Sequence, residues 1–147
     1  MSGKTKARAA ARLAAVQALY QHAMEGTALP RLLDEFHRHR LGVEIEDVQM
    51  AAAETAFFDD VVTGVLARSE EIDALISSKL AEGWALERLD RTMLQILRAG
   101  AYELMARADV ATGTAISEYL DVAHAFFDQR EAKFVNGALD AVAKAVR

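Results

Sequence analysis

The sequence predicts an all-α protein, and three observations support this fold class. Hydrophobic residues make up 52% of the 147 residues, there is one proline, and apolar side chains recur at helical spacing. Alanine is abundant and clusters of β-branched residues are few, which favours helices over strands. A chain of this length forms one domain, or two small subdomains that share a core.

The first helix is expected over residues 5–24, with Gly26 as a left-handed cap after its end. Lys4, Arg8 and Arg12 follow one another at i, i+4 spacing and form a basic stripe. A separate apolar face is formed by Ala9, Leu13, Val16, Tyr20 and Met24. We therefore expect this helix to dock through its apolar face and to leave the basic stripe available.

Three more helices are expected in the first half of the chain. The second has Pro30 in its first turn, where no donor is lost, and it closes at Gly42. The third covers residues 48–69 and carries a wide apolar band. The fourth begins at Ser69, which is suited to capping it, and ends before a break at residues 83–84.

The fifth helix, residues 86–106, is apolar around most of its circumference, which is typical of a helix at the centre of a fold. The sixth is capped by Thr112 or Thr114, and the seventh follows a loop at residues 128–130. The apolar residues expected on the sixth are Ile116, Leu120, Ala123 and Phe127. In the seventh helix, Phe134 lies about 100° from the centre of the apolar stripe. The total is about seven helices.

The charge of the chain is divided unevenly along its length. The first twenty residues hold four basic side chains and none of the 22 acids, which leaves 13 basic against 22 acidic residues beyond them, a net charge of −9. The four basic residues are Lys4, Lys6, Arg8 and Arg12. Such polarity indicates a polyanionic partner, most often nucleic acid. The alternative is a helix face that is simply solvated.

No pattern indicates catalysis, a metal site or a cofactor. The eight glycines are dispersed and form no phosphate-binding loop. His37 and His39 lie about 200° apart around a helix and cannot bind a metal from one face. There is no cysteine, and no apolar run approaches the ~20 residues of a membrane span. We expect a cytoplasmic protein that is not an enzyme and does not enter a membrane.

Six short motifs are spread over essentially the whole chain. They are AVQALY at 15–20, RL at 88–89, ILR at 96–98, YEL at 102–104, AISE at 115–118 and KFVNG at 133–137. In this order and spacing they resemble the NusB family of bacterial transcription antitermination factors. The first and last of them are the most specific.

The resemblance implies a single domain of residues 1–147 built from two packed helical halves, about 1–69 and 70–147. It also implies partners. NusB-like proteins pair with the small-subunit ribosomal protein that acts as NusE, and the pair binds boxA elements of nascent, single-stranded RNA. This complex joins an antitermination assembly on RNA polymerase and supports ribosomal RNA transcription. Both a monomer and a homodimer are compatible with the family.

The resemblance further implies RNA contacts from two stretches of the chain. The family's N-terminal and last-helix segments match at Lys4, Lys6, Arg8, Arg12, Lys133 and Phe134. The chain also departs from the family pattern. Ala9 and Ala10 stand where arginines are frequent, which weakens phosphate contacts, and Met93 stands where an acidic residue is common. Ser117 replaces a usual asparagine and Phe127 a usual glycine.

Several interpretations are left open by the sequence. Phe134 either stacks on an RNA base or packs against a neighbouring helix. Tyr20 is expected to pack in the core with its hydroxyl at an edge, and Gly137 to allow a close helix approach. The alternative function is a protein-interaction module of the same fold without direct RNA binding.

Overall fold

The computed structural model describes residues 3–38 and 52–147, and this part of the chain is helical without a strand. It contains seven α-helices and one short 3₁₀ helix, so the predicted all-α class is confirmed. The chain divides into two compact units, Met1–Thr63 and Gly64–Arg147, each with its own internal packing. We describe each unit by itself.

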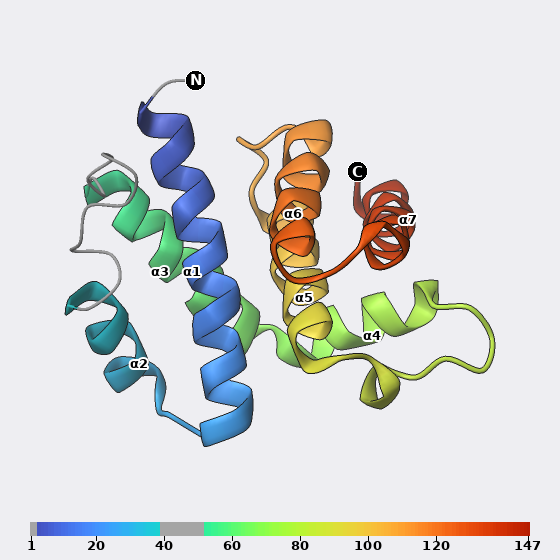
Figure 1. Cartoon of the computed structure of the whole chain (residues 1–147), viewed down its shortest axis with the longest axis horizontal. Helices are drawn as coiled ribbons and strands as arrows, with labels where there is room; N and C mark the ends of the chain where they lie inside the picture. The colour runs from blue at the N-terminus through green and yellow to red at the C-terminus, as the bar shows by residue number, and fades with distance from the viewer. Residues whose placement is uncertain (1–2, 39–51) are drawn as a thin grey trace. The chain divides into compact units, whose positions relative to one another are not determined.

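The first unit contains α1 (Gly3–Glu25), α2 (Leu29–Phe36) and most of α3 (Ala52–Ala67), as Figure 1 shows. Helix α1 contacts α2. Gly26 has a φ of 71°, and its N–H donates to the carbonyl of His22 at 2.9 Å, so the predicted left-handed cap is confirmed. The predicted closure at Gly42 and the predicted start of the third helix at residue 48 lie outside the described residues.

The buried face of α1 differs from the predicted one. Its buried apolar residues are Ala7, Ala11, Ala14, Ala15, Val16, Ala18 and Leu19. Tyr20 and Met24 are 39% and 54% exposed, so the prediction that Tyr20 packs in the core is wrong. Small alanine side chains allow a close approach of neighbouring backbone, and α1 therefore packs mostly through alanines, with Val16 and Leu19, while Tyr20 and Met24 face solvent.

The second unit is organised around α5 (Arg91–Ala106), which contacts α4 (Ser69–Lys79), α6 (Thr112–Phe126) and α7 (Gln129–Val146). Eleven of the 16 residues of α5 are buried. The prediction that this helix is central is confirmed within its unit. The burial of its apolar side chains supplies the largest favourable term for folding here.

The predicted start of the fifth helix and the predicted caps of the fourth and sixth are wrong. Residues 86–88 form the 3₁₀ helix η2 (Leu86–Arg88), and α5 begins only at Arg91. Asp90 caps it: its carboxylate accepts from the N–H groups of Thr92 at 2.8 Å and Met93 at 3.2 Å. Neither α4 nor α6 has a side-chain cap, because Ser69 and Thr112 are already the first helical residues.

Helix α6 is rotated by one residue from the predicted face. The residues that it buries are Ala115, Tyr119, Val122 and Ala123. The Tyr119 hydroxyl donates to the buried carboxylate of Glu103 on α5. This hydrogen bond compensates for burying two polar groups, and it draws the tyrosine face of α6 toward α5.

A close helix contact in this unit lies at Gly100, whereas none lies at Gly137. A Cβ atom added at Gly100 would lie 2.9 Å from a methyl carbon of Leu139 on α7. Nothing lies within 4 Å of the same position at Gly137, so the prediction of a close approach there is wrong. Glycine at 100 lets α7 pack directly against the backbone of α5.

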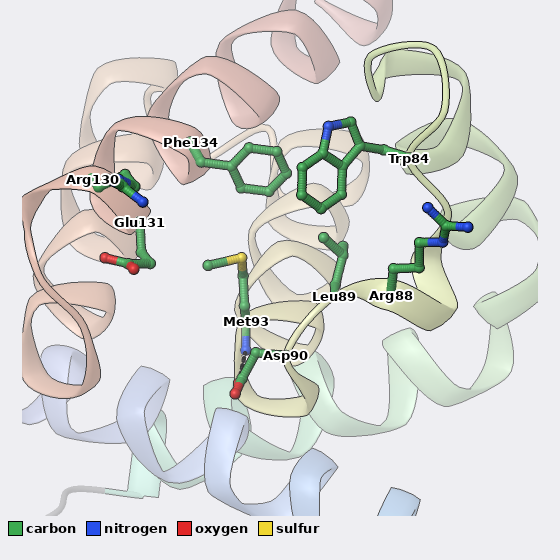
Figure 2. Close-up of a pocket in the computed structure, with 8 residues that line it drawn as sticks. All are labelled: Trp84, Arg88, Leu89, Asp90, Met93, Arg130, Glu131 and Phe134. Atoms are coloured by element: carbon green, nitrogen blue, oxygen red, sulfur yellow. Dashed lines mark hydrogen bonds between the residues drawn. The ribbon is translucent and has the colours of Figure 1, made fainter.

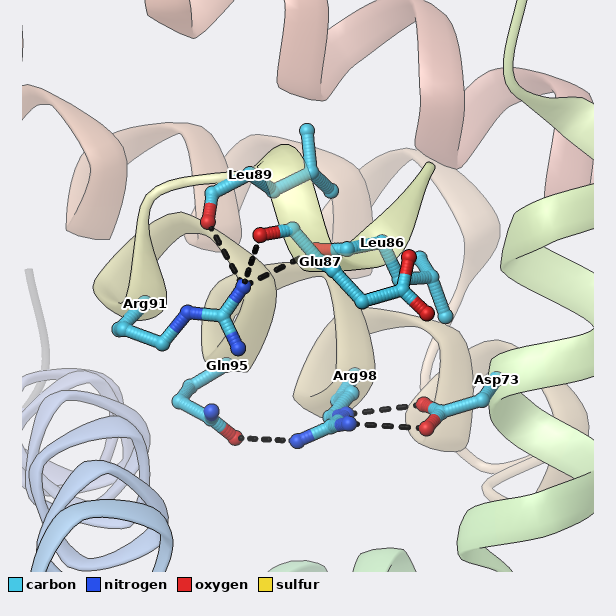
Figure 3. A network of polar contacts seen from close by, with 7 residues as sticks. All are labelled: Asp73, Leu86, Glu87, Leu89, Arg91, Gln95 and Arg98. Atoms are coloured by element: carbon cyan, nitrogen blue, oxygen red, sulfur yellow. Dashed lines mark hydrogen bonds and ion pairs between the residues drawn. The ribbon is translucent and has the colours of Figure 1, made fainter. Parts of the chain in front are cut away.

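Arginine side chains fix the connections around α5 (Figure 3). The Arg91 guanidinium donates to the carbonyls of Leu86, Glu87 and Leu89 at 3.1, 2.9 and 3.0 Å. Arg98 donates two hydrogen bonds of 2.8 Å to the carboxylate of Asp73 and so ties α5 to α4.

Candidate nucleic-acid interface

The N-terminal half of α1 presents basic side chains to solvent in part only. Lys6 is exposed, and the side chain of Arg8 is 24% exposed. Lys4 belongs to α1, but its side chain lies outside the described residues. These positions are those at which the sequence predicts phosphate contacts.

Arg12 is placed differently from the prediction. It is 2% exposed, so the expectation of an available basic stripe is wrong at this position. Its guanidinium carbon lies 5.0 Å from the ring centre of Phe57 on α3, and that of Arg8 lies 4.4 Å from the same ring. Both cations therefore stack on one buried aromatic ring, an attraction that holds them to α3.

An acidic side chain belongs to the same cluster. Glu54 in the first turn of α3 is 2% exposed, and its Oε1 lies 3.8 Å from Nε of Arg8. Neither of these two buried atoms makes a hydrogen bond. The pair is therefore an ion pair without the directional contact that gives such pairs most of their strength.

In the second unit, Phe134 lines a pocket of about 320 Å³ (Figure 2). Its ring centre lies 6.3 Å from that of Trp84, with the two planes tilted by 42°. Leu89 and Met93 form the apolar floor between them. This volume is at the lower end of the ~300–1,000 Å³ typical of small-molecule sites.

The two rings differ in accessibility. Phe134 is half-buried, as its position off the apolar stripe indicated, whereas Trp84 is 54% exposed. A single exposed ring is common on protein surfaces, and Trp84 is informative because it lines an apolar pocket together with Phe134. Phe134 packs against Trp84 and borders the pocket, and its stacking on an RNA base stays a prediction.

The rim of the pocket is charged. The exposed side chains of Arg88 and Arg130 line it, together with Asp90 and Glu131. Lys133, also exposed, neighbours Phe134 in the chain. The Asp90 carboxylate is engaged in capping α5. Stacking surfaces beside arginines are the arrangement with which proteins hold unpaired nucleotides.

The sequence did not point to Trp84, Arg88 or Arg130 as site residues. The available signal was weak: a lone tryptophan at the break after Gly83, where no periodic face explains it. The pocket appears only when η2 and the start of α7 come together.

Other kinds of site find no support in the described part of the chain. Residues 3–38 and 52–147 hold no group of three or more metal-ligating side chains close enough to share an ion. Among the helices of these same residues, none has the length and apolar character needed to cross a membrane.

Comparisons with known proteins agree in sequence and in structure. The chain is 77% identical over 97% of its length to transcription antitermination protein NusB of Novosphingobium aromaticivorans, 96% of which is covered. The corresponding protein of Sphingopyxis alaskensis is 62% identical over 100% of this chain and 99% of its own.

Two solved structures share the fold. NusB of T. maritima superposes with a TM-score of 0.79 at 30% identity, covering 93% of this chain and 90% of its own. A complex of antitermination factors NusB and NusE with dsRNA gives 0.80 at 26% identity, covering 95% and 98%. The NusB family model matches residues 9–144. The chain therefore belongs to the NusB family.

Proposed function

We propose that this protein is a transcription antitermination factor that binds boxA-type single-stranded RNA together with the NusE-type small-subunit ribosomal protein. In this role it joins the antitermination complex on RNA polymerase and supports ribosomal RNA transcription. Relatives with 77% and 62% identity carry the name transcription antitermination protein. A solved relative, 26% identical, is a complex of NusB and NusE with dsRNA.

The observation that carries RNA binding is the exposed ring of Trp84 beside Phe134. An unstacked base that enters the pocket meets the contiguous aromatic surface of Trp84 and Phe134 and the apolar side chain of Met93. Each such stacking contact contributes about 1–3 kcal/mol and tolerates any base. Arg88, Arg130 and Lys133 supply positive charge for the flanking phosphates.

The basic end of α1 provides the second proposed RNA contact. Lys4, Lys6 and Arg8 would bind phosphate oxygens, which gives affinity that falls with salt and carries little sequence information. The buried Arg12 serves this contact indirectly by fixing the ring on which Arg8 also stacks. With so few accessible cations, the protein alone binds RNA weakly, and the ribosomal protein extends the RNA-binding surface.

The remaining features follow from this proposal. The protein acts in the cytoplasm, where transcripts are made, without catalysing a reaction and without a cofactor. It works as one domain of residues 1–147 with helical halves of about 1–69 and 70–147, as a monomer or a homodimer.

A gel-shift titration with boxA RNA tests the proposal, with and without the NusE-type protein and with a scrambled RNA of the same length as control. Preferential binding of boxA RNA, strengthened by the partner protein, is the expected result. Equal binding of both RNAs at low salt with the partner present would favour the alternative, a protein-interaction module without direct RNA recognition.

A further inference from the structure

The carboxylate of Glu54 occupies an unusual place for an acid. It is buried in the first turn of α3, next to the arginine that is proposed to bind phosphate. A buried carboxylate normally receives hydrogen bonds that compensate for its lost hydration. Oε1 of Glu54 accepts no hydrogen bond, and Nε of Arg8 donates none. The two atoms lie 3.8 Å apart.

This geometry makes Arg8 exchangeable. At 3.8 Å, Nε of Arg8 and Oε1 of Glu54 are too far apart for a hydrogen bond, so the ion pair restrains the guanidinium less than a hydrogen-bonded pair would, and the contact with Phe57 is the other restraint. The Arg8 side chain is 24% exposed, while that of Glu54 is 3% exposed. The arginine can therefore swing toward solvent, whereas the glutamate stays inside. An RNA phosphate reaching α1 offers Arg8 a short, charge-assisted hydrogen bond in place of the loose pair.

Phe57 keeps the cluster intact when this exchange occurs. The guanidinium groups of both Arg8 and Arg12 stack on its buried ring. After Arg8 turns away, Arg12 remains on the ring as a cation in the same cluster. The site can thus give up one of its two positive charges to a ligand.

We propose that Glu54 is an internal competitor of RNA for Arg8 and thereby sets the RNA affinity of the N-terminal arm. The inference rests on the proposed RNA-binding function and adds to it a residue that touches no RNA. Its consequence is an arm kept weak on its own, so that firm binding requires the stacking pocket and the partner protein as well.

The test is a double-mutant cycle on RNA binding, measured by fluorescence anisotropy with boxA RNA at fixed salt. Glu54→Gln, nearly the same size but uncharged, should bind about two- to fivefold more tightly than the original protein. The gain should vanish when Arg8→Ala is present in both proteins compared. Glu25→Gln, an equal change of charge at the exposed far end of α1, should leave the affinity unchanged.

Three results would overturn the inference. They are equal or weaker binding by a folded Glu54→Gln protein, a gain that persists without Arg8, and the same gain in Glu25→Gln. Circular dichroism establishes folding, and Glu54→Met serves as the second variant if the glutamine protein does not fold. If the original protein binds boxA no better than scrambled RNA, the proposed function itself fails. Binding by the original protein without a gain in the variants refutes only the role of Glu54.

Discussion

The ring of Trp84, on the turn before η2, lies 6.3 Å from the ring of Phe134 on α7. The two residues come from distant parts of the sequence, yet their rings pack together into one aromatic surface of the pocket. Neither residue alone would be a nucleotide site. In the proposed function, their pairing supplies the surface on which an RNA base stacks.

Removing either ring should weaken RNA binding without changing its salt dependence. Trp84→Ala and Phe134→Ala should each cost about 1–3 kcal/mol of binding free energy, because a base loses one stacking surface and no charge changes. Anisotropy titrations between 50 and 200 mM salt, roughly the range over which phosphate contacts weaken, measure both quantities. Phe126→Ala is the control, since Phe126 is 44% exposed but does not line the pocket. An equal loss of binding free energy in Phe126→Ala would show that the pocket is not part of the RNA-binding surface.

Arg8 and Arg12 should separate into a binding and a structural residue. Arg8→Ala should lower the slope of log affinity against log salt by about 0.7, the value for one lost phosphate contact on single-stranded RNA. Arg12→Ala should keep the slope and lower the free energy of unfolding by about 1–3 kcal/mol, because a buried side chain packed on Phe57 is lost. Urea unfolding of both variants completes the comparison. A reduced slope in a folded Arg12→Ala protein would instead assign Arg12 to the phosphates.

Two glycines should respond oppositely to the same substitution. Gly100→Ala should destabilise the protein by about 1–3 kcal/mol, because the new methyl group would lie 2.9 Å from a carbon of Leu139 in a packed core. Gly137→Ala should stabilise it by about 0.5–1 kcal/mol, since the position is helical, exposed and open. Thermal and urea unfolding distinguish the two. Similar effects of the two changes would contradict the packing described for α5 and α7.

The last arginine should contribute more to stability than its exposure suggests. The Arg147 guanidinium donates to the carbonyls of Leu104, Arg107 and Val110 at 2.9, 2.8 and 2.7 Å, closing the end of α5. Arg147→Ala should lower the free energy of unfolding by about 1.5–3 kcal/mol, the range for hydrogen bonds to a charged group. Lys144→Ala, which breaks only a surface ion pair, should cost at most about 0.5 kcal/mol. If Arg147→Ala and Lys144→Ala lowered the free energy of unfolding equally, water would be replacing the hydrogen bonds of Arg147 without loss of stability.

The sequence predicts well what depends on local pattern. The seven helices, the cap at Gly26 and the central position of α5 within its unit all follow from periodicity, glycine placement and hydrophobicity, and the structure confirms them. The motifs that resemble the NusB family lead to the same family as the comparisons. These features can be predicted from residues close together in the chain or from a recognisable set of motifs.

What the sequence does not predict depends on packing partners. A periodicity that gives large apolar side chains the most weight does not identify the alanine face of α1 as the buried one. For this reason Tyr20 was predicted to pack in the core. From the sequence, Arg12 is predicted to be a surface cation, but in the structure it is buried against Phe57 of α3. The pocket requires Trp84 and Phe134 to meet across the fold. Each of these facts is set by contacts between distant segments, which one sequence does not reveal.

The three carbonyl contacts of Arg91 have a consequence for the kinetics of recognition. They hold the turn of η2, which follows Trp84, to the start of α5 before any ligand arrives. A wall that is already rigid loses little conformational entropy when a base enters, and binding at that wall does not wait for a loop to fold. If the pocket binds RNA as proposed, we expect its encounter with a transcript to be governed by diffusion and charge rather than by rearrangement of η2.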